Sequence, residues 1–138
     1  MQIAIVFDSR TGTTKAMAEE MARIAAAAGH ECTVQAVQAA SAPDVSGADA
    51  VCIGSWTEGL MIIRQHATQQ TMEFIDELWL DGVPVAVFCT YKLSPGRLLD
   101  KMTRAVEARG GRVTGAFRSR GSEVPDGFAV WLDSLGPG

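Results

Sequence analysis

The sequence predicts an α/β protein in which helices cover both faces of a parallel β-sheet. Two observations support this fold class. Short, nearly continuous apolar runs recur along the chain, which is typical of strands buried on both faces. Segments with apolar residues at helical spacing separate these runs, and such alternation indicates a parallel sheet. The chain has 138 residues, 47% hydrophobic and 20% charged, and we expect one domain over residues 1–138.

The first part of the chain predicts two strands joined by a helix. Residues 2–7 form the first apolar run, and the small polar residues 8–14 indicate a loop after it. A helix is expected over about 15–28, because apolar residues recur there at helical spacing and Gly29 is a natural stop. Alternation over 31–37 predicts the second strand.

The middle of the chain predicts a third strand and a second long helix. The composition of 38–49 indicates a connector with one short helical turn near Asp44. A buried strand is expected at 50–54, and an irregular stretch at 55–67. A helix over 68–80 follows. Its apolar residues are expected on one face: Met72, Ile75, Leu78 and Trp79.

Two further strands and two helices complete the pattern. Residues 83–89 form another buried run, and 90–94 indicate a loop. A proline suits the first turn of the helix expected over 95–109, which a pair of glycines follows. A shorter strand is expected at 112–117, and a closing helix at 125–135. The closing helix is expected to face the core through Phe128, Trp131, Leu132 and Leu135.

Composition and charge exclude several classes of function. The net charge is −4, from 12 Lys and Arg against 16 Asp and Glu. This argues against a general nucleic-acid binder, whose phosphate contacts need a basic face. No apolar run approaches the roughly 20 residues that span a bilayer, and the N-terminus lacks the features of a signal peptide. We therefore expect a cytoplasmic protein without a membrane span.

The cysteines give no sign of a disulfide or metal scaffold. Cys32, Cys52 and Cys89 are odd in number and far apart, without a Cys-x-x-Cys motif, and the two histidines do not cluster. Cys52 and Cys89 lie inside apolar strands and are expected to be inert core residues. Trp79 and Trp131, at helical spacing with other apolar residues, are also expected in the core.

Three loops are expected at the edge of the sheet where ligands bind, beyond the carboxyl ends of the strands: 8–14, 55–63 and 90–94. The first holds four hydroxyl residues and one glycine, and it opens a helix whose N-terminal N–H groups favour anions. We predict a phosphate site there. The alternative is an ordinary helix cap, for which one hydroxyl residue would suffice.

The first loop does not match the common phosphate motifs. It lacks the two glycines of a Walker A loop and the glycine fingerprint of dinucleotide-binding proteins. No cysteine lies in it to act as a phosphatase nucleophile. A phosphoacceptor domain would have an Asp at the end of the third strand, where this chain has Gly54 and Ser55.

An aromatic residue follows each of two predicted strands at the same edge. Trp56 begins the second loop, and Tyr91, the only tyrosine of the chain, lies in the third. Two such rings can sandwich a planar ligand and contribute roughly 1 kcal/mol per stacked face. The alternative is that they only cover the edge of the sheet. Their position beside the phosphate loop favours a flat cofactor.

Together these three loops resemble those of flavodoxins. The family's phosphate loop is Thr/Ser-x-Thr-Gly-x-Thr, which residues 9–14 match. Its second loop has a Trp followed by a Gly-acid-Gly turn, of which Trp56-Thr57-Glu58-Gly59 keeps the Trp, the acid and the final Gly. Its third loop places a Tyr on the outer flavin face, as Tyr91 would be. The resemblance covers essentially the whole chain. It implies a three-layer α/β/α sandwich with a five-stranded parallel sheet in the order 2-1-3-4-5.

The resemblance implies non-covalent FMN and one-electron transfer between redox partners, a reductase and an acceptor. Hydroxyls and N–H groups of 9–14 would hold the phosphate, and Trp56 and Tyr91 would flank the isoalloxazine. The backbone of 57–59 would flip to hydrogen-bond N5 of the reduced flavin, and the glycine lowers the cost of the flip. The flavin carries the redox chemistry, so no catalytic residue and no metal ligand is expected. The implied cofactor-binding residues are Ser9, Arg10, Thr11, Gly12, Thr13, Thr14, Ser55, Trp56, Thr57, Glu58, Gly59, Thr90, Tyr91 and Lys92.

The charges near the expected flavin depart from the family pattern. Flavodoxins surround the flavin with acidic loops, whereas the third loop here contains Lys92 and no acid. Arg10, Arg64 and Arg97 are also expected near the site. Opposite charge stabilises an anion, so we expect the second reduction of the flavin at a higher potential than in typical flavodoxins. Thr13 also stands where the family usually has Asn.

Two features beside the second loop leave other functions open. Residues 60–63 are apolar and are expected to pack under the loop, with a docking or homodimer patch as the alternative. His66 is expected at the surface, with proton donation to a quinone as the alternative. The rivals to an electron carrier are a small FMN-dependent quinone or protoporphyrinogen-type oxidoreductase and a flavodoxin-fold interaction module that has lost FMN.

Overall fold

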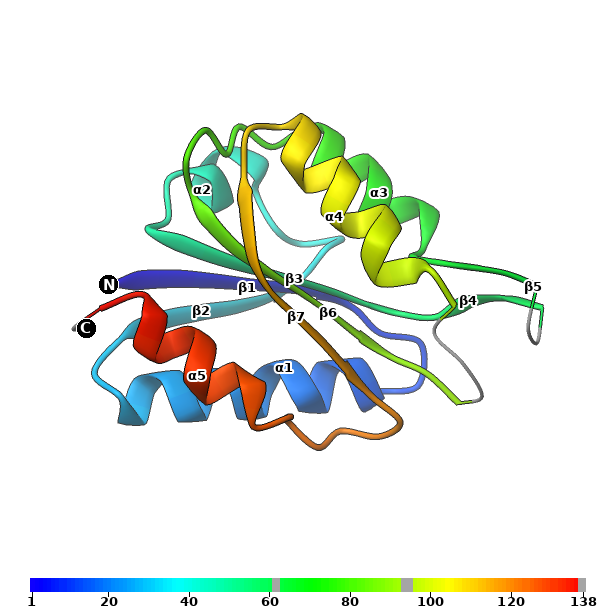
Figure 1. Cartoon of the computed structure of the whole chain (residues 1–138), viewed down its shortest axis with the longest axis horizontal. Coiled ribbons are helices and arrows are strands. Elements are labelled where there is room, and N and C mark those ends of the chain that lie inside the picture. The colour runs from blue at the N-terminus through cyan, green and yellow to red at the C-terminus, as the bar shows by residue number, and fades with distance from the viewer. Residues whose placement is uncertain (61–62, 93–95, 137–138) are drawn as a thin grey trace.

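A computed structural model describes residues 1–60, 63–92 and 96–136, and only the backbone for 58–60 and 63–66. The strands are β1 (Gln2–Asp8), β2 (Glu31–Ala36), β3 (Ala50–Trp56), β4 (Glu58–Leu60), β5 (Ile63–His66), β6 (Pro84–Thr90) and β7 (Arg112–Ser119). The helices are α1 (Thr13–Ala27), α2 (Ala42–Ser46), α3 (Gln69–Asp76), α4 (Leu98–Ala108) and α5 (Gly127–Ser134). Figure 1 shows them as three layers with the sheet in the middle.

The main sheet has five parallel strands in the order β2-β1-β3-β6-β7. This is the predicted order 2-1-3-4-5 of the five long strands, so the prediction is confirmed. All five strands run the same way, and their carboxyl ends therefore meet at one edge. At that edge Asp8 pairs in register with Ser55, and Trp56 with Thr90.

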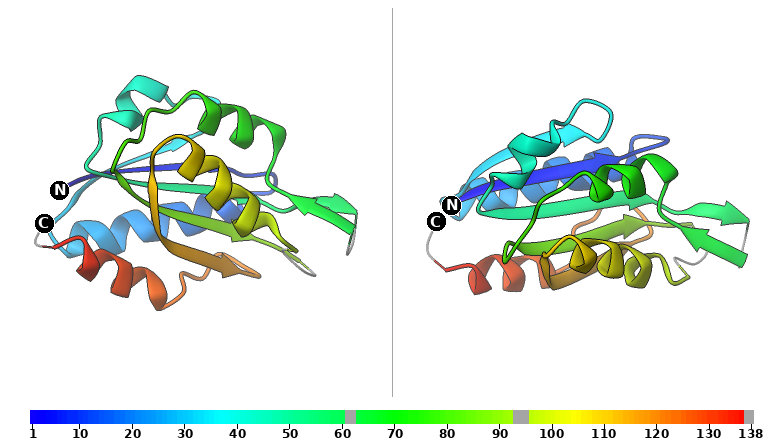
Figure 2. Two further views of the ribbon diagram at one scale, coloured as in Figure 1. Left: turned by 45° about the horizontal axis from the view of Figure 1, so that its top comes forward. Right: turned by 90° about the horizontal axis from the view of Figure 1, so that it is seen from above.

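Two apolar cores hold the layers together, one on each face of the sheet. The first packs α2, α3 and α4 against the sheet around Ile75, Leu98 and Met102, all 0% exposed. The second packs α1 and α5 against the other face around Met17 and Phe128. Figure 2 shows these helices on the two sides of the sheet. Burial on both faces explains why β1, β3 and β6 are continuous apolar runs.

The two edge strands are less buried than the central ones. β2 alternates between exposed and half-buried residues, as an edge strand does when its helix layer ends beside it.

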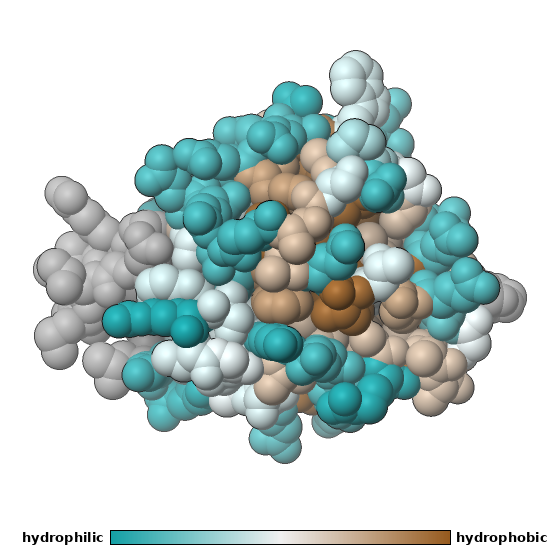
Figure 3. Space-filling view, turned by 180° about the vertical axis from the view of Figure 1, so that it is seen from behind, coloured by the Kyte–Doolittle hydropathy of each residue, from teal (hydrophilic) through white to brown (hydrophobic). Residues whose placement is uncertain are grey.

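The face seen from behind, on the side of β2, has apolar residues near its middle and polar residues around them (Figure 3). No helix in the described part of the chain is long and apolar enough to cross a membrane.

A small hairpin corrects the prediction of an irregular stretch at 55–67. β3 continues to Trp56, and β4 and β5 then pair antiparallel, with Glu58 opposite His66 and Leu60 opposite Ile63. The hairpin extends from the carboxyl edge of the sheet (Figure 1). It was missed because its strands are only three and four residues long, too short for a periodic pattern.

The prediction that Trp79 lies in the core is wrong. Helix α3 ends at Asp76 rather than at residue 80, so helical spacing no longer applies to the residues that follow. Leu78 and Leu80 are 0% exposed, and Trp79 between them points outward with 76% of its surface exposed. Trp131 is confirmed as a core residue at 3% exposed.

Gly54 of β3 leaves room for the large aromatic ring of Phe88 on the neighbouring strand β6. A Cβ at this position would come within 2.0–2.4 Å of three ring carbons of Phe88. Phe88 is 0% exposed and is paired with Gly54 in the β3–β6 register. The glycine therefore makes room for the ring, directly before the residues that enter the second loop.

Candidate functional site

The predicted site loops meet at the carboxyl edge of the sheet. β1, β3 and β6 are neighbours, and they end at Asp8, Trp56 and Thr90. The first loop is tied to the third, because the Thr14 and Thr90 hydroxyls lie 2.6 Å apart. The second is also tied to the third, because Thr57 donates to the Thr90 carbonyl from its N–H at 3.0 Å and from its hydroxyl at 2.9 Å.

The start of helix α1 has the form of an anion site rather than of a capped helix. Gly12 occupies the N-cap position with φ of 94°, and no side chain caps the helix. Ser9 instead accepts a hydrogen bond from the Gly12 N–H at 3.0 Å, within the loop. Nothing lies within 4 Å of the position that a Gly12 Cβ would take. The first N–H groups of α1 therefore lack a side-chain acceptor, which is what an anion at a helix N-terminus supplies.

The hydroxyls of the first loop fall into two groups. Thr11 is exposed, Ser9 and Thr13 are half-buried, and the Thr11 and Thr13 oxygens lie 3.4 Å apart. Thr14 differs, because it is 1% exposed and its hydroxyl bonds to Thr90 at the end of β6. Ser9, Thr11 and Thr13 therefore lie together at the start of α1. The hydroxyl of Thr14 instead joins α1 to β6.

Both predicted aromatic residues lie at this edge, and each has a guanidinium over its ring. Trp56 and Tyr91 are half-buried. The Arg10 Cζ lies 5.3 Å from the centroid of the Trp56 ring, and the Arg120 Cζ lies 5.8 Å from that of Tyr91. These distances are typical of cation–π contacts. Sequence reasoning named Arg10 but missed Arg120, because the residues after β7 were not counted among the site loops.

The remaining predicted residues have different surroundings. Ser55 is 0% exposed, and its hydroxyl accepts from the Thr68 N–H at 3.1 Å and donates to the Trp56 carbonyl at 2.7 Å. Lys92 is exposed. Glu58 and Gly59 lie in β4, where the sequence predicts an irregular stretch. The apolar side chains of 60–63, which the sequence predicts to pack under the loop or to form a docking patch, lie outside the described part of the structure. The side chains of Arg64 and His66 and residues 93–95 lie outside it as well.

A buried polar junction beneath the loops was not predicted. Asp8, 7% exposed, accepts hydrogen bonds from the Thr68 hydroxyl and from the Gln38 amide, the latter at 3.2 Å. Thr68 caps helix α3 by accepting from the Thr71 N–H at 3.2 Å. Asp8 thus joins the end of β1 to the start of α3. The sequence signal was an acid at the end of an apolar strand, which alone did not indicate its partners.

The buried cysteines are not nucleophiles. Burial raises the pKa of the Cys89 thiol to about 12, and it raises that of Cys52 well above its usual value. Both side chains are 0% exposed, so their assignment as core residues is confirmed. In the described part of the chain, no three His, Cys, Asp or Glu side chains come together in a way that could hold a metal ion.

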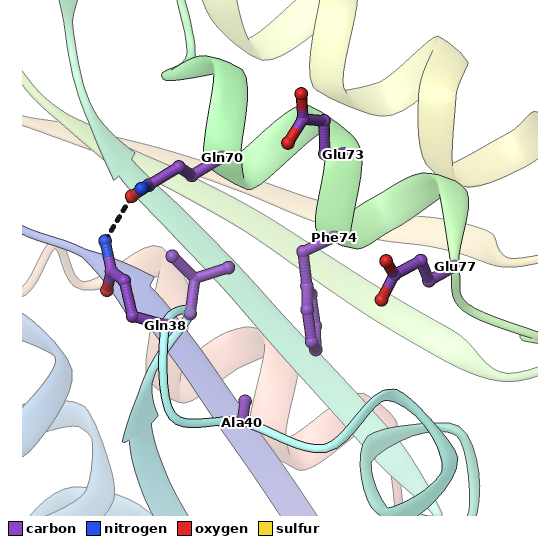
Figure 4. A pocket seen from close by; sticks show the side chains of 7 residues that line it. Gln38, Ala40, Gln70, Glu73, Phe74 and Glu77 are labelled. Carbon is purple, nitrogen blue, oxygen red and sulfur yellow. Dashed lines mark hydrogen bonds between the residues drawn. The ribbon is translucent and has the colours of Figure 1, made fainter.

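A separate hollow lies beside α3, away from the aromatic pair. Its volume is about 430 Å³. Figure 4 shows Glu73 and Phe74 of α3, and Glu77 directly after the helix, on one side and the chain after β2 on the other. Gln38 and Gln70 are hydrogen-bonded across it. Its lining residues are Val37, Gln38, Ala40, Gln70, Glu73, Phe74 and Glu77.

The residues at the carboxyl edge fit the two parts of FMN. The uncapped start of α1, with open space at Gly12 and three hydroxyl residues around it, suits a phosphate dianion. Trp56 and Tyr91, on neighbouring strand ends, suit a planar ring. The donor set therefore agrees with the cofactor that the sequence predicted.

Comparisons with known proteins agree with this geometry. The family model for flavodoxin matches residues 5–127. No curated protein matches the chain. Among solved structures, the two-electron reduced flavodoxin of Megasphaera elsdenii has a TM-score of 0.77 and 28% identity, covering 97% of this chain and 95% of that one.

Two flavodoxins from Bacillus cereus are similar in fold. Oxidised flavodoxin 1 has a TM-score of 0.77 and 18% identity, covering 98% of this chain and 95% of its own. Oxidised flavodoxin 2 has a TM-score of 0.74 and 20% identity, with the same coverage of 98% and 95%. At these identities both support the fold alone.

Proposed function

Because this chain belongs to the flavodoxin family of FMN-binding electron-transfer proteins, we propose that it is a one-electron carrier between redox partner proteins. The observation that carries the proposal is the uncapped start of α1 beside two aromatic residues at the same edge of the sheet. When bound, FMN supplies the redox chemistry. The chain positions the cofactor and sets its potential. We expect the protein to act in the cytoplasm.

The described residues take distinct roles in this proposal. The first N–H groups of α1 and the hydroxyls of Ser9, Thr11 and Thr13 bind the phosphate, because they surround the uncapped helix start. Trp56 and Tyr91 flank the isoalloxazine. Thr14 and Ser55 act as positioning residues, because their hydroxyls are engaged within the protein. Thr57 anchors the second loop to β6, so a flip of this loop would begin after it.

The charges of the site favour a raised second potential. Arg10, Lys92 and Arg120 are exposed on or beside the loops. A cation near the ring stabilises the anionic, fully reduced cofactor. We therefore expect the second one-electron potential to be higher than in flavodoxins with acidic loops. Potentiometric titration of the FMN-loaded protein measures it, and a second potential as low as theirs would refute this expectation.

An FMN titration of purified protein tests the cofactor assignment. Visible absorption and tryptophan fluorescence are followed together in a Trp79→Phe variant, whose remaining tryptophans are the half-buried Trp56 and the buried Trp131. We expect perturbed flavin bands and saturable quenching. Riboflavin, which lacks the phosphate, is the matched ligand and is expected to bind more weakly. Absence of any spectral change and of quenching at high FMN would refute the proposal.

The carrier and oxidoreductase functions differ in turnover. A carrier is expected to exchange electrons with protein partners and to reduce quinones slowly, whereas a quinone reductase turns over with a quinone and a reductant. Steady-state quinone reduction by the FMN-loaded protein separates the two. Rapid, saturable turnover would favour the enzyme.

A further inference from the structure

We propose that the carboxyl edge of the sheet is a docking surface for a redox partner whose own surface is acidic, recognised by four cations: Arg10, Lys92, Arg118 and Arg120. This inference rests on the proposed function, since it specifies the partner of the same site. We call these four residues the cationic rim. All four are exposed.

The cationic rim comes from the carboxyl ends of three strands of the main sheet, β1, β6 and β7. Arg10 follows β1, Lys92 follows β6, and Arg118 and Arg120 lie at the end of β7. None of them forms an ion pair with a carboxylate in the described part of the chain. The ion pairs found there are Arg23–Glu20 in α1 and Arg97–Asp100 at the start of α4. The charges of the rim are therefore available to a partner.

The rim is positively charged, whereas the net charge of the whole chain is −4. The one acid that ends a strand beside it, Asp8, is 7% exposed and is hydrogen-bonded to Thr68 and Gln38. Three exposed acids, Glu31, Asp49 and Asp81, lie at the opposite edge, where strands begin, and two others, Glu123 and Asp126, lie in the connection from β7 to α5. The four cations of the rim outnumber these two acids, so the carboxyl edge is positive relative to a molecule whose net charge is −4. Such a distribution orients an approaching acidic surface toward this edge.

The geometry of two arginines favours carboxylates as the groups recognised. The Arg10 and Arg120 guanidinium groups lie over the Trp56 and Tyr91 rings. A guanidinium stacked on a ring keeps its N–H donors in its plane, where a carboxylate can accept two of them. The rings that flank the cofactor in the proposed function would then lie directly beneath the contact.

Amide chemical-shift mapping with an oligoglutamate peptide, of the chain saturated with FMN and of the flavin-free chain, tests the proposal. In both states we expect shifts in residues 10, 91–92 and 118–120 at low salt, and a loss of binding as salt increases. Shifts confined to residues 9–12 that FMN abolishes would assign the binding to the start of α1 and would overturn the proposal. An oligolysine peptide of equal length is the matched ligand and is expected to leave these residues unchanged. Shifts centred elsewhere, or equal shifts with both peptides, would overturn the proposal.

Charge-reversal variants give the second measurement. Lys92→Glu with Arg118→Glu is expected to weaken oligoglutamate binding on the order of tenfold, because two exposed attractions become repulsions. Arg104→Glu with Arg112→Glu, which makes the same change of net charge at exposed residues of α4 and of the first position of β7, is the control and is expected to leave the affinity within about twofold. Equal weakening by both changes would mean that only net charge matters, which overturns a localised surface.

The same samples distinguish failure of this inference from failure of the proposed function. FMN binding without oligoglutamate binding at the rim refutes the acidic partner and leaves the electron carrier. Oligoglutamate binding at the rim without FMN binding refutes the electron carrier, and the surface then belongs to an interaction module.

Discussion

Replacing Thr14 by Val tests whether its hydroxyl supports the site or binds the cofactor. The hydroxyl lies 2.6 Å from that of Thr90, and the two residues are 1% and 4% exposed. Val has nearly the same shape as Thr, so the change leaves the Thr90 hydroxyl buried without this partner. An unsatisfied buried hydroxyl costs about 1–3 kcal/mol. For a domain of this size, each kcal/mol lowers the Tm by roughly 4 °C.

The assay is thermal and denaturant unfolding of the flavin-free protein. We expect Thr14→Val to lower the Tm by roughly 4–12 °C and Thr14→Ser to change it little. A Thr14→Val, Thr90→Val double variant removes both polar groups and is expected to regain much of the loss.

Flavin binding by the same variants separates the two roles of the hydroxyl. If it is structural, Thr14→Val weakens FMN and riboflavin by the same factor. The reasoning is refuted if flavin-free stability does not change, or if FMN affinity falls while riboflavin affinity is preserved. The latter result would assign the hydroxyl to the phosphate.

Three further predictions concern the core and the surface. Gly54→Ala is expected to destabilise the protein by about 3 kcal/mol or more, because its Cβ would lie 2.0 Å from a buried ring carbon of Phe88. Chemical denaturation measures this against Gly121→Ala, where nothing lies within 4 Å and the change is expected to stay within about 0.5 kcal/mol. Trp79→Ala is expected to change the unfolding free energy by less than about 0.5 kcal/mol, because the side chain is 76% exposed, and a large loss would refute the assigned surface position. The Cys89 pKa is raised from 9.0 to about 12 in the folded protein, so its neutral thiol stabilises the fold below pH 9 and this contribution is lost as the pH rises toward 12. Cys89→Ala is therefore expected to show a shallower fall of unfolding free energy over that interval, and equal slopes would contradict the assignment.

The fold was predictable because the central strands carry an unambiguous signal. β1, β3 and β6 are buried on both faces and therefore consist almost wholly of apolar residues. Their alternation with helices constrains the sheet to be parallel. The strand order was not contained in that alternation and came from the resemblance of the loops to a known family. Composition and spacing identify which segments form strands, whereas the order of the strands depends on contacts between distant residues.

The two wrong predictions, a buried Trp79 and an irregular stretch at 55–67, concern segments where the spacing of apolar residues does not indicate the local structure. Trp79 satisfied the helical pattern of the residues before it, but α3 ends at Asp76 and the next residues alternate in burial. The hairpin β4–β5 was missed because pairing of such short strands depends on their position beyond β3 and not on their composition. Both errors lie at the end of an element, where tertiary contacts decide the path of the chain.

In the site loops, too, the sequence does not determine which partner each hydroxyl group contacts. The sequence placed four hydroxyl residues in the first loop and treated them as equivalent phosphate donors. Which of them faces the helix start depends on the registers that join β1 to β3 and β3 to β6. Together these registers align the ends of β1 and β6, where the Thr14 and Thr90 hydroxyls meet. A hydroxyl in a polar loop bonds to whichever partner the fold brings close, and the sequence does not contain that partner's position. Composition therefore predicts that an anion site exists, and the sheet register determines which side chains form it.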